Sequence, residues 1–233
     1  MRYQLRSLFD FSAFCLYGPS RAVFNVALRN LRLAVVGLAL FGLSATAARA
    51  DALILALGDS LTAGYGLDNA DSFPVRLEQA LNAAGHEVTV TNGGVSGDTS
   101  KGGLSRVDWL FAEKPDLLLL ELGANDGLRG LPPEDTQANL AAIIEKAQAA
   151  DVPVLLTGMM APPNLGREYG EAFNAVFPAL ADRYDVYFYP FFLDGVAADP
   201  SLNQGDGMHP NAKGVDVIVE RILPSVIEAL EAE

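Results

Sequence analysis

The 233-residue sequence has few of the side chains that bind transition metals: one cysteine and two histidines. The cysteine, Cys15, lies in an N-terminal segment that we expect to be removed, so the mature chain would hold no disulfide and no thiolate ligand. The H-E-x-x-H motif of many zinc hydrolases is also missing. These absences argue against cysteine chemistry and against a metal-dependent hydrolase, and we expect the protein to need no cofactor.

Basic residues are also few, with 16 Lys and Arg against 29 Asp and Glu. Residues 1–50 contain six of the basic residues and one of the acidic residues, so residues 51–233 carry ten and twenty-eight, a formal charge of -18. Such a surface repels nucleic acid and anionic membranes. We therefore expect neither of them as a partner.

The apolar run at residues 33–43 is short, about half of the ~20 residues that span a bilayer. It follows Arg29 and Arg32 and precedes Ala48-Arg49-Ala50, an A-x-A pattern of the kind that signal peptidase cuts. The sequence therefore predicts a cleaved signal peptide and leader over residues 1–50, and no stable membrane anchor afterwards. A retained anchor is the alternative.

After Asp51, short apolar runs alternate with longer amphipathic segments, a pattern typical of a parallel sheet covered by helices on both faces. Four apolar residues repeat at helical spacing and should face the sheet: Leu140, Ile143, Ile144 and Ala147. The sequence predicts one α/β domain over residues 51–233. We expect strands at residues 53–57, 88–91, 117–122, 154–157 and 186–189, and helices near residues 72–84, 103–111, 136–150, 168–184 and 213–230.

Small and polar residues cluster directly after the first three predicted strands, at residues 58–60, 92–98 and 123–127. The carboxyl ends of parallel strands meet at one edge of a sheet, and open α/β sheets bind their ligands at that edge. The sequence therefore predicts a functional site there.

Ser60 follows the first strand and can occupy the first turn of a helix, where its hydroxyl would face the crevice. A hydroxyl is a weak nucleophile unless a base removes its proton. His86 lies in a turn between a helix and a strand, which leaves His209 as the candidate base. Asp206 precedes His209 by three residues in the loop G-D-G-M-H-P and can hold its Nδ1 atom, although the same residues would also suit an exposed turn.

Acyl transfer also needs donors for the oxyanion that forms on the substrate carbonyl. The backbone N–H groups of Ser60 and Gly97 and the side-chain amide of Asn125 could supply three. In isolation, Gly97 could equally be a turn glycine and Asn125 a capping residue.

Four segments, LGDSLTAGYG, NGGVSGDT, ELGANDGLRG and DGMHP, resemble in order the four blocks of the GDSL/SGNH hydrolases. The resemblance extends from Asp51 to the C-terminus. It implies a three-layer α/β/α sandwich with a flavodoxin-like sheet of five parallel strands in the order 2-1-3-4-5. It also implies Ser60 as nucleophile, Asp206 and His209 as its acid-base partners, and Ser60, Gly97 and Asn125 as the oxyanion hole.

Within that family the chain is similar to multifunctional periplasmic enzymes of proteobacteria. This similarity implies a periplasmic monomer that cleaves aryl esters, acyl-CoA thioesters and lysophospholipids, small-molecule substrates with an acyl chain. Residues 159–166 resemble the mobile loop over the acyl groove, although the methionines could simply be packing at the end of a strand. The implied substrate contacts are Met159, Met160, Pro162, Asn164 and Leu165.

Other nucleotide and hydrolase motifs are missing. The G-x-G-x-x-G turn of dinucleotide-binding domains and the Gly-Lys-Ser or Gly-Lys-Thr ending of a phosphate-binding loop do not occur after the first strand, and Thr62 breaks the G-x-S-x-G pattern of ordinary α/β-hydrolases. Two alternatives remain: a carbohydrate O-deacetylase and a catalytically silent acyl-binding protein. The one tryptophan, Trp109, falls inside a predicted helix and argues against the first, and the complete triad argues against the second.

Overall fold

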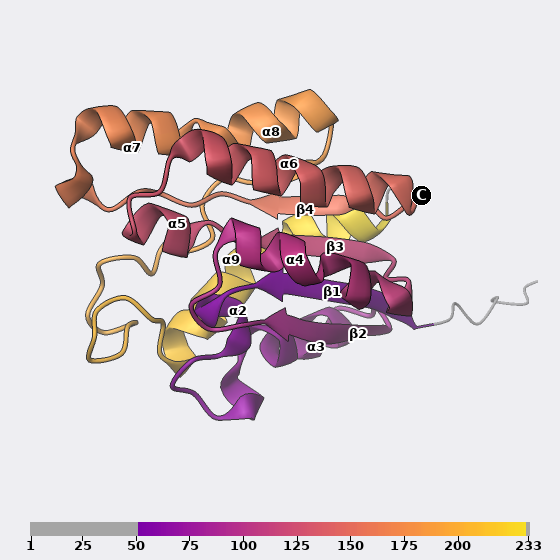
Figure 1. Cartoon of the computed structure of the whole chain (residues 1–233). Coiled ribbons are helices and arrows are strands. Elements are labelled where there is room, and N and C mark those ends of the chain that lie inside the picture. The colour runs from indigo at the N-terminus through magenta and orange to yellow at the C-terminus, as the bar shows by residue number, and fades with distance from the viewer. Residues whose placement is uncertain (1–50, 232–233) are drawn as a thin grey trace, which may run out of the picture. The chain divides into compact units, whose positions relative to one another are not determined.

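Five parallel strands form one sheet in the order β2-β1-β3-β4-β5 (Figure 1). This computed structural model describes residues 51–231, so the predicted signal peptide and cleavage site lie outside the described residues. The order and the direction of the strands confirm the predicted sheet. The strands are β1 (Ala52–Gly58), β2 (Val88–Gly94), β3 (Leu117–Glu121), β4 (Val154–Thr157) and β5 (Tyr187–Tyr189).

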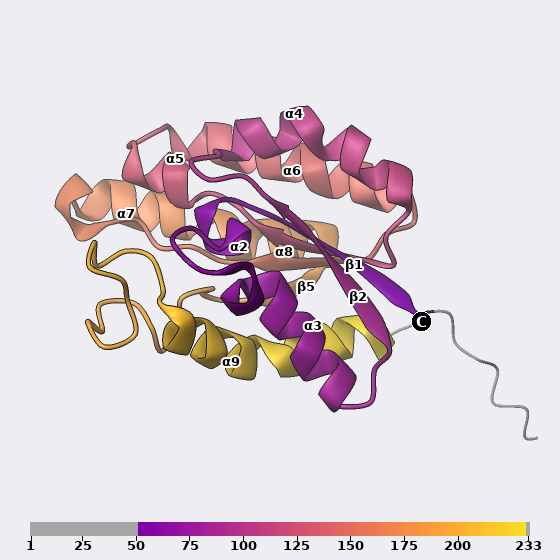
Figure 2. The same cartoon turned by 90° about the horizontal axis from the view of Figure 1, so that it is seen from below.

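Helices cover both faces of the sheet and make the predicted three-layer sandwich (Figure 2). On one face, α3 (Phe73–Ala83) packs against α9 (Ala212–Glu231). On the other face, α6 (Pro133–Ala149) lies between α4 (Ser100–Leu110) and α8 (Val176–Tyr184). The remaining elements are short: α2 (Ser60–Ala63), α5 (Ala124–Leu128), α7 (Arg167–Asn174), and the 3₁₀ turns η1 (Asn69–Asp71), η2 (Phe111–Glu113) and η3 (Pro163–Leu165).

The core lies between the sheet and these helices. The central strands β1 and β3 contain unbroken apolar runs because helices bury both of their faces. Leu140, Ile143, Ile144 and Ala147 of α6 are fully buried, as their helical spacing predicts. Within residues 51–231, no helix is long and apolar enough to cross a membrane.

Three helices differ from the sequence prediction, and one of them is α6, which was expected from residue 136 and begins at Pro133. The helix expected over residues 168–184 breaks at Ala175 into α7 and α8. Pro178 lies in the first turn of α8 and has no N–H for an earlier carbonyl, so one continuous helix would lose a hydrogen bond there. The helix expected from residue 103 begins instead at Ser100, because the Thr99 side chain caps it by accepting the Gly102 N–H.

Candidate active site

Ser60 is the first residue of α2, directly after the carboxyl end of β1. Asp59 caps this short helix, and its Oδ1 accepts the backbone N–H of Leu61 at 3.0 Å. A side chain at Gly58 would collide with Thr62, so the tight turn from strand to helix requires glycine there. The local sequence therefore places the Ser60 hydroxyl at the edge of the sheet where the functional site was predicted.

His209 lies between Ser60 and Asp206. Its Nε2 atom is 3.0 Å from Ser60 Oγ, and its Nδ1 atom is 2.6 Å from Asp206 Oδ2. Asp206 Oδ1 also accepts the backbone N–H groups of His209 and Met208. These two hydrogen bonds, together with the one to the imidazole, hold the pKa of Asp206 far below its usual range, so the carboxylate is ionised. The structure thus brings the three predicted residues together in the order that general-base activation requires.

The loop that carries His209 is fastened to the loop after α2. The backbone N–H of Gln204 donates to the His209 carbonyl at 2.7 Å. The side-chain Nε2 of Gln204 donates to the carbonyls of Tyr65 and Pro210. The Tyr65 ring lies 4.6 Å from the His209 ring, centroid to centroid. Gln204 and Tyr65 therefore help to hold the imidazole beside Ser60, and sequence reasoning missed both.

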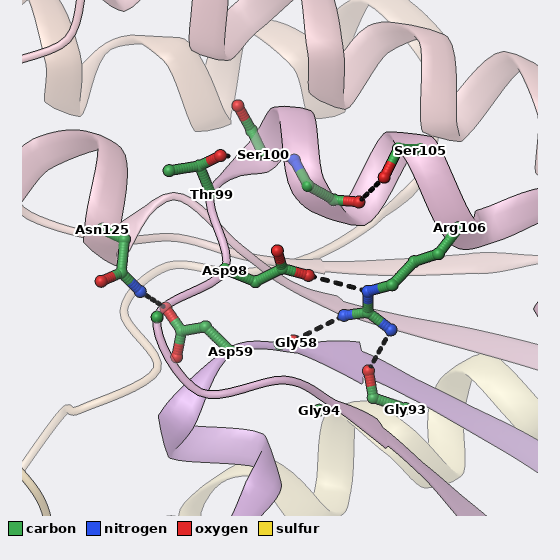
Figure 3. A network of polar contacts seen from close by, with 12 residues as sticks. Gly58, Asp59, Gly93, Gly94, Asp98, Thr99, Ser100, Ser105, Arg106 and Asn125 are labelled. Atoms are coloured by element: carbon green, nitrogen blue, oxygen red, sulfur yellow. Dashed lines mark hydrogen bonds and ion pairs between the residues drawn. The ribbon is translucent and has the colours of Figure 1, made fainter.

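Gly97 lies in the loop between β2 and α4 with a φ of +82°, a conformation that favours glycine. Arg106 of α4 holds this loop against the sheet (Figure 3). Its guanidinium donates to Asp98 Oδ2 and to the carbonyls of Gly93, the next-to-last residue of β2, and Gly58, the last residue of β1. Arg106 was not predicted, because its partners lie up to 48 residues away in the sequence.

Asn125 lies in the first turn of α5, and its Nδ2 donates to Asp59 Oδ2 at 2.9 Å (Figure 3). An amide nitrogen carries two hydrogens, so one is fixed by Asp59 and the other is left for a substrate oxygen. Asp59 therefore both caps the helix of the nucleophile and orients a candidate oxyanion donor, a role that the sequence prediction missed.

The neighbouring Asp126 is buried and ties α5 to two other helices. Its carboxylate accepts the backbone N–H and the hydroxyl of Ser100 at the start of α4, and the hydroxyl of Thr136 in α6. Because α5 carries Asn125 and the loop before α4 carries Gly97, this bonding holds the two candidate donors near each other.

Glu121, at the end of β3, is a fully buried acid beneath the Ser60 turn. Its Oε2 accepts the Thr62 hydroxyl at 2.7 Å and the Asp59 N–H at 3.3 Å, whereas Oε1 is buried without a partner among residues 51–231. Burial raises the pKa of Glu121 well above its usual range and raises the pKa of Asp59 to about 6. Burial therefore favours the protonated, uncharged form of Glu121 beneath the Ser60 turn.

This buried acid predicts a pH-dependent stability. The unfolded chain loses the Glu121 proton at an ordinary pH and the folded chain keeps it, so the free energy of unfolding falls as the pH rises above that of an ordinary glutamate. Glu121→Gln replaces the carboxyl group with an amide, which does not titrate, so the variant lacks this pH dependence. We expect the stability of the variant relative to the wild type to increase as the pH rises above about 5, by at most about 1.4 kcal/mol per pH unit.

Urea unfolding at several pH values measures this difference. Glu113→Gln, a change of an exposed acid in η2, is the matched control and should give a difference that hardly varies with pH. Parallel stability curves for the wild type and Glu121→Gln would show that Glu121 is ionised in the folded protein.

A cleft of about 730 Å³ opens beside Ser60, Gly97 and Asn125. Most of its other lining is apolar, as in sites that bury a ligand with a hydrocarbon part. Its apolar lining comes from α5 and the segment after β4, with Leu128, Met159, Met160, Ala161, Pro162 and Pro163, and from the loops after α2 and β5, with Tyr65, Phe191, Leu193, Ala197, Ala198 and Met208.

The predicted substrate contacts divide into two groups. Met159, Met160 and Pro162 line the cleft. Asn164 and Leu165 do not, because η3 turns the chain away: Asn164 is exposed, and Leu165 lies beside Gly130. For these two residues the contact with substrate stays a prediction. The lining by Tyr65, Phe191 and Leu193 was not predicted, because the block that contains Tyr65 gave it no role and the other two lie outside the four blocks.

The other histidine lies away from the cleft. His86 is in the turn between α3 and β2, and its Nε2 is 4.0 Å from a carboxylate oxygen of Glu231, near the end of α9. Across residues 51–231 there is no group of three or more His, Cys, Asp or Glu side chains that could hold a metal ion.

Comparison with known proteins gives consistent matches. Residues 56–217 match the model of the GDSL-like Lipase/Acylhydrolase family. The chain is 42% identical over 174 residues to Esterase TesA of Pseudomonas aeruginosa, which covers 74% of this chain and 87% of that protein. It is 39% identical over 197 residues to an Arylesterase of Vibrio mimicus, with 84% and 98% covered.

A third relative is the Thioesterase 1/protease 1/lysophospholipase L1 of Escherichia coli K12, 42% identical over 166 residues, with 71% of this chain and 78% of that protein covered. Among solved structures, the SGNH-hydrolase family esterase AlinE4 superposes with a TM-score of 0.66 at 46% identity, over 78% of this chain and 98% of that one.

Proposed function

The chain belongs to the GDSL lipase/acylhydrolase family and hydrolyses esters and thioesters, and we propose that it does so through an acyl-enzyme formed on Ser60. The observation that carries the proposal is the 3.0 Å contact between Ser60 Oγ and His209 Nε2, with Asp206 on the far side of the imidazole, at the mouth of an apolar cleft. A nucleophile, a base and an orienting carboxylate in this order are the parts of a serine hydrolase.

In the first half of the reaction, Ser60 Oγ bonds to the substrate carbonyl carbon as His209 Nε2 takes the hydroxyl proton. The ionised Asp206 stabilises the imidazolium that results. Negative charge moves to the carbonyl oxygen, where the N–H groups of Ser60 and Gly97 and the second hydrogen of Asn125 Nδ2 can bind it. The bond between the carbonyl carbon and the leaving group then breaks, and His209 gives its proton to the departing alcohol or thiol. Water repeats these steps to release the acid.

The substrate is a small molecule whose acyl chain lies in the cleft. Support comes from the apolar lining and from the names of the relatives, which include an arylesterase and a thioesterase/lysophospholipase. The mechanism uses no metal. Export to the periplasm stays a prediction from residues 1–50, and N-terminal sequencing of the mature protein, which should begin at or near Asp51, tests it.

Rates on a series of aryl esters and thioesters of increasing acyl length test the proposed function. We expect kcat/KM to rise with chain length, by at most about fourfold per methylene, because each buried methylene contributes ~0.8 kcal/mol. A chelator should leave every rate unchanged. Absence of turnover on the whole series would contradict the proposal and favour the silent acyl-binding alternative, whereas activity confined to acetylated sugars would favour the deacetylase.

Two variants, Met160→Ser and Leu165→Asn, show whether the cleft lining causes the rate to depend on the acyl-chain length. Met160→Ser alters a residue that lines the cleft, so it should flatten the dependence and spare acetyl esters. Leu165→Asn is the matched control, because Leu165 lies outside the cleft, and it should keep the wild-type dependence. Equal losses by Met160→Ser on short and long esters would mean that Met160 supports the catalytic residues instead.

A further inference from the structure

Arg129 lies at the edge of the cleft and has no part in the mechanism above. It directly follows α5 and is exposed, and its Nη2 donates to the carbonyl of Gly97 at 2.8 Å. Both neighbours belong to the site: Gly97 lines the cleft, and so does Leu128, which precedes Arg129 in the chain. The hydrogen bond therefore holds a guanidinium next to the place where the substrate carbonyl is expected to react.

Arg129 is one of five basic side chains among residues 51–231 that form no ion pair with a carboxylate of those residues. Residues 51–231 are strongly acidic, and in them five basic side chains are paired with carboxylates: Arg76, Arg106, Lys146, Arg167 and Arg221. No carboxylate of the described residues lies within 4.0 Å of the Arg129 guanidinium. A guanidinium carries five N–H donors, and the Gly97 carbonyl takes one hydrogen bond, so donors remain for an anion.

The cleft mouth suits a molecule with an apolar tail and a charged head. Six large apolar side chains among residues 51–231 are exposed, and four of them line this cleft, so the apolar surface is concentrated where the substrate enters. The four are Tyr65, Leu128, Met160 and Met208. Arg129 adds a positive charge to the edge of this apolar mouth.

We propose that Arg129 binds the phosphate of a phosphorylated leaving group, the chemistry that lysophospholipids and acyl-CoA thioesters share. The planar guanidinium matches phosphate oxygens in geometry and keeps its charge at every physiological pH. With the acyl chain in the cleft and the carbonyl at Gly97 and Asn125, the phosphate of such a leaving group lies beyond the reacting bond, outside the apolar lining. This inference rests on the proposed ester and thioester hydrolysis.

Two matched pairs of substrates separate phosphate binding from other roles of Arg129. The first pair is a lysophosphatidylcholine and the monoacylglycerol with the same acyl chain. The second is an acyl-CoA and the N-acetylcysteamine thioester of the same acid, which carries no phosphate. The variants are Arg129→Gln and Arg129→Lys. The matched control is Arg183→Gln, an exposed arginine in the last turn of α8, at the opposite edge of the sheet.

We expect Arg129→Gln to lower kcat/KM about tenfold on the phosphate-bearing substrates, mainly through KM, and to change the phosphate-free partners by less than about twofold. Arg129→Lys should keep part of the preference, because a lysine retains the charge without the paired geometry. Arg183→Gln should behave as the wild type. A loss confined to one of the two phosphate substrates would support the proposal and identify the leaving group.

Equal losses on both members of each pair would overturn the proposal, since Arg129 would then position Gly97 for catalysis. Unchanged rates on all four substrates would also overturn it. Either result would leave the proposed function intact as long as the wild type turns over the phosphate-free substrates. Failure of the wild type on all four substrates would instead contradict the proposed function.

Discussion

Ser60→Ala should lower kcat on esters by about 10⁴-fold or more and leave the fold unchanged. The hydroxyl that is removed lies 3.0 Å from His209 Nε2, and without it His209 and Asp206 have no nucleophile to activate. The turn itself should survive, because Asp59, not Ser60, caps α2. Steady-state rates on an aryl ester, with urea unfolding of the same samples, measure both effects.

Ser105→Ala is the control for this change. Ser105 is an exposed residue of α4 whose hydroxyl donates to the Gly102 carbonyl in its own helix, so its removal should leave the rate within about twofold of the wild type. A Ser60→Ala protein that retained a tenth of the wild-type activity would mean that another group is the nucleophile.

Asn125→Ala should lower kcat by about 10²- to 10³-fold with little change in KM, the effect expected for one oxyanion donor. The donor acts on charge that develops only in the transition state, so substrate affinity should hardly change. The substitution also removes the hydrogen bond from Asn125 Nδ2 to Asp59, which lowers the pKa of Asp59 in the wild type. The pKa of Asp59 should therefore rise above about 6 in the variant.

Asn139→Ala provides a matched comparison, since Asn139 also donates its Nδ2 to a side-chain oxygen, that of Ser100, but does not line the cleft. It should cost stability and spare kcat. A rise in KM alone for Asn125→Ala would identify Asn125 as a contact to the ground state of the substrate.

The helices and strands could be predicted because their signals are local, whereas the strand order came from the resemblance to the family. Apolar runs such as that in β3 are buried on both faces, and the spacing of Leu140, Ile143, Ile144 and Ala147 follows the contact face of α6. The break at Ala175 was missed, because the residues on both sides of it favour helix and only Pro178 marks it.

For the site, motifs predicted the residues that the proposed chemistry requires and missed those that hold them. Asp59 bonds to Asn125 across 66 residues and Arg106 to Gly58 across 48, and no local pattern reports such pairs. Glu121 ends an otherwise apolar strand and begins the block ELGANDGLRG, but the block alone gave it no role. Asn164 and Leu165 lie outside the cleft lining, and their contact with substrate stays a prediction.

Covalent labelling with an aryl dialkyl phosphate tests the central claim most directly. Attack of the Ser60 oxygen on phosphorus would expel the aryl alcohol and leave a dialkyl phosphoryl group that is stable enough for mass spectrometry. The account predicts one phosphoryl group per chain, located on the peptide that contains Ser60, with activity lost in proportion to labelling and no label in Ser60→Ala. A stoichiometric label on another residue, or full activity in a protein labelled at Ser60, would contradict it.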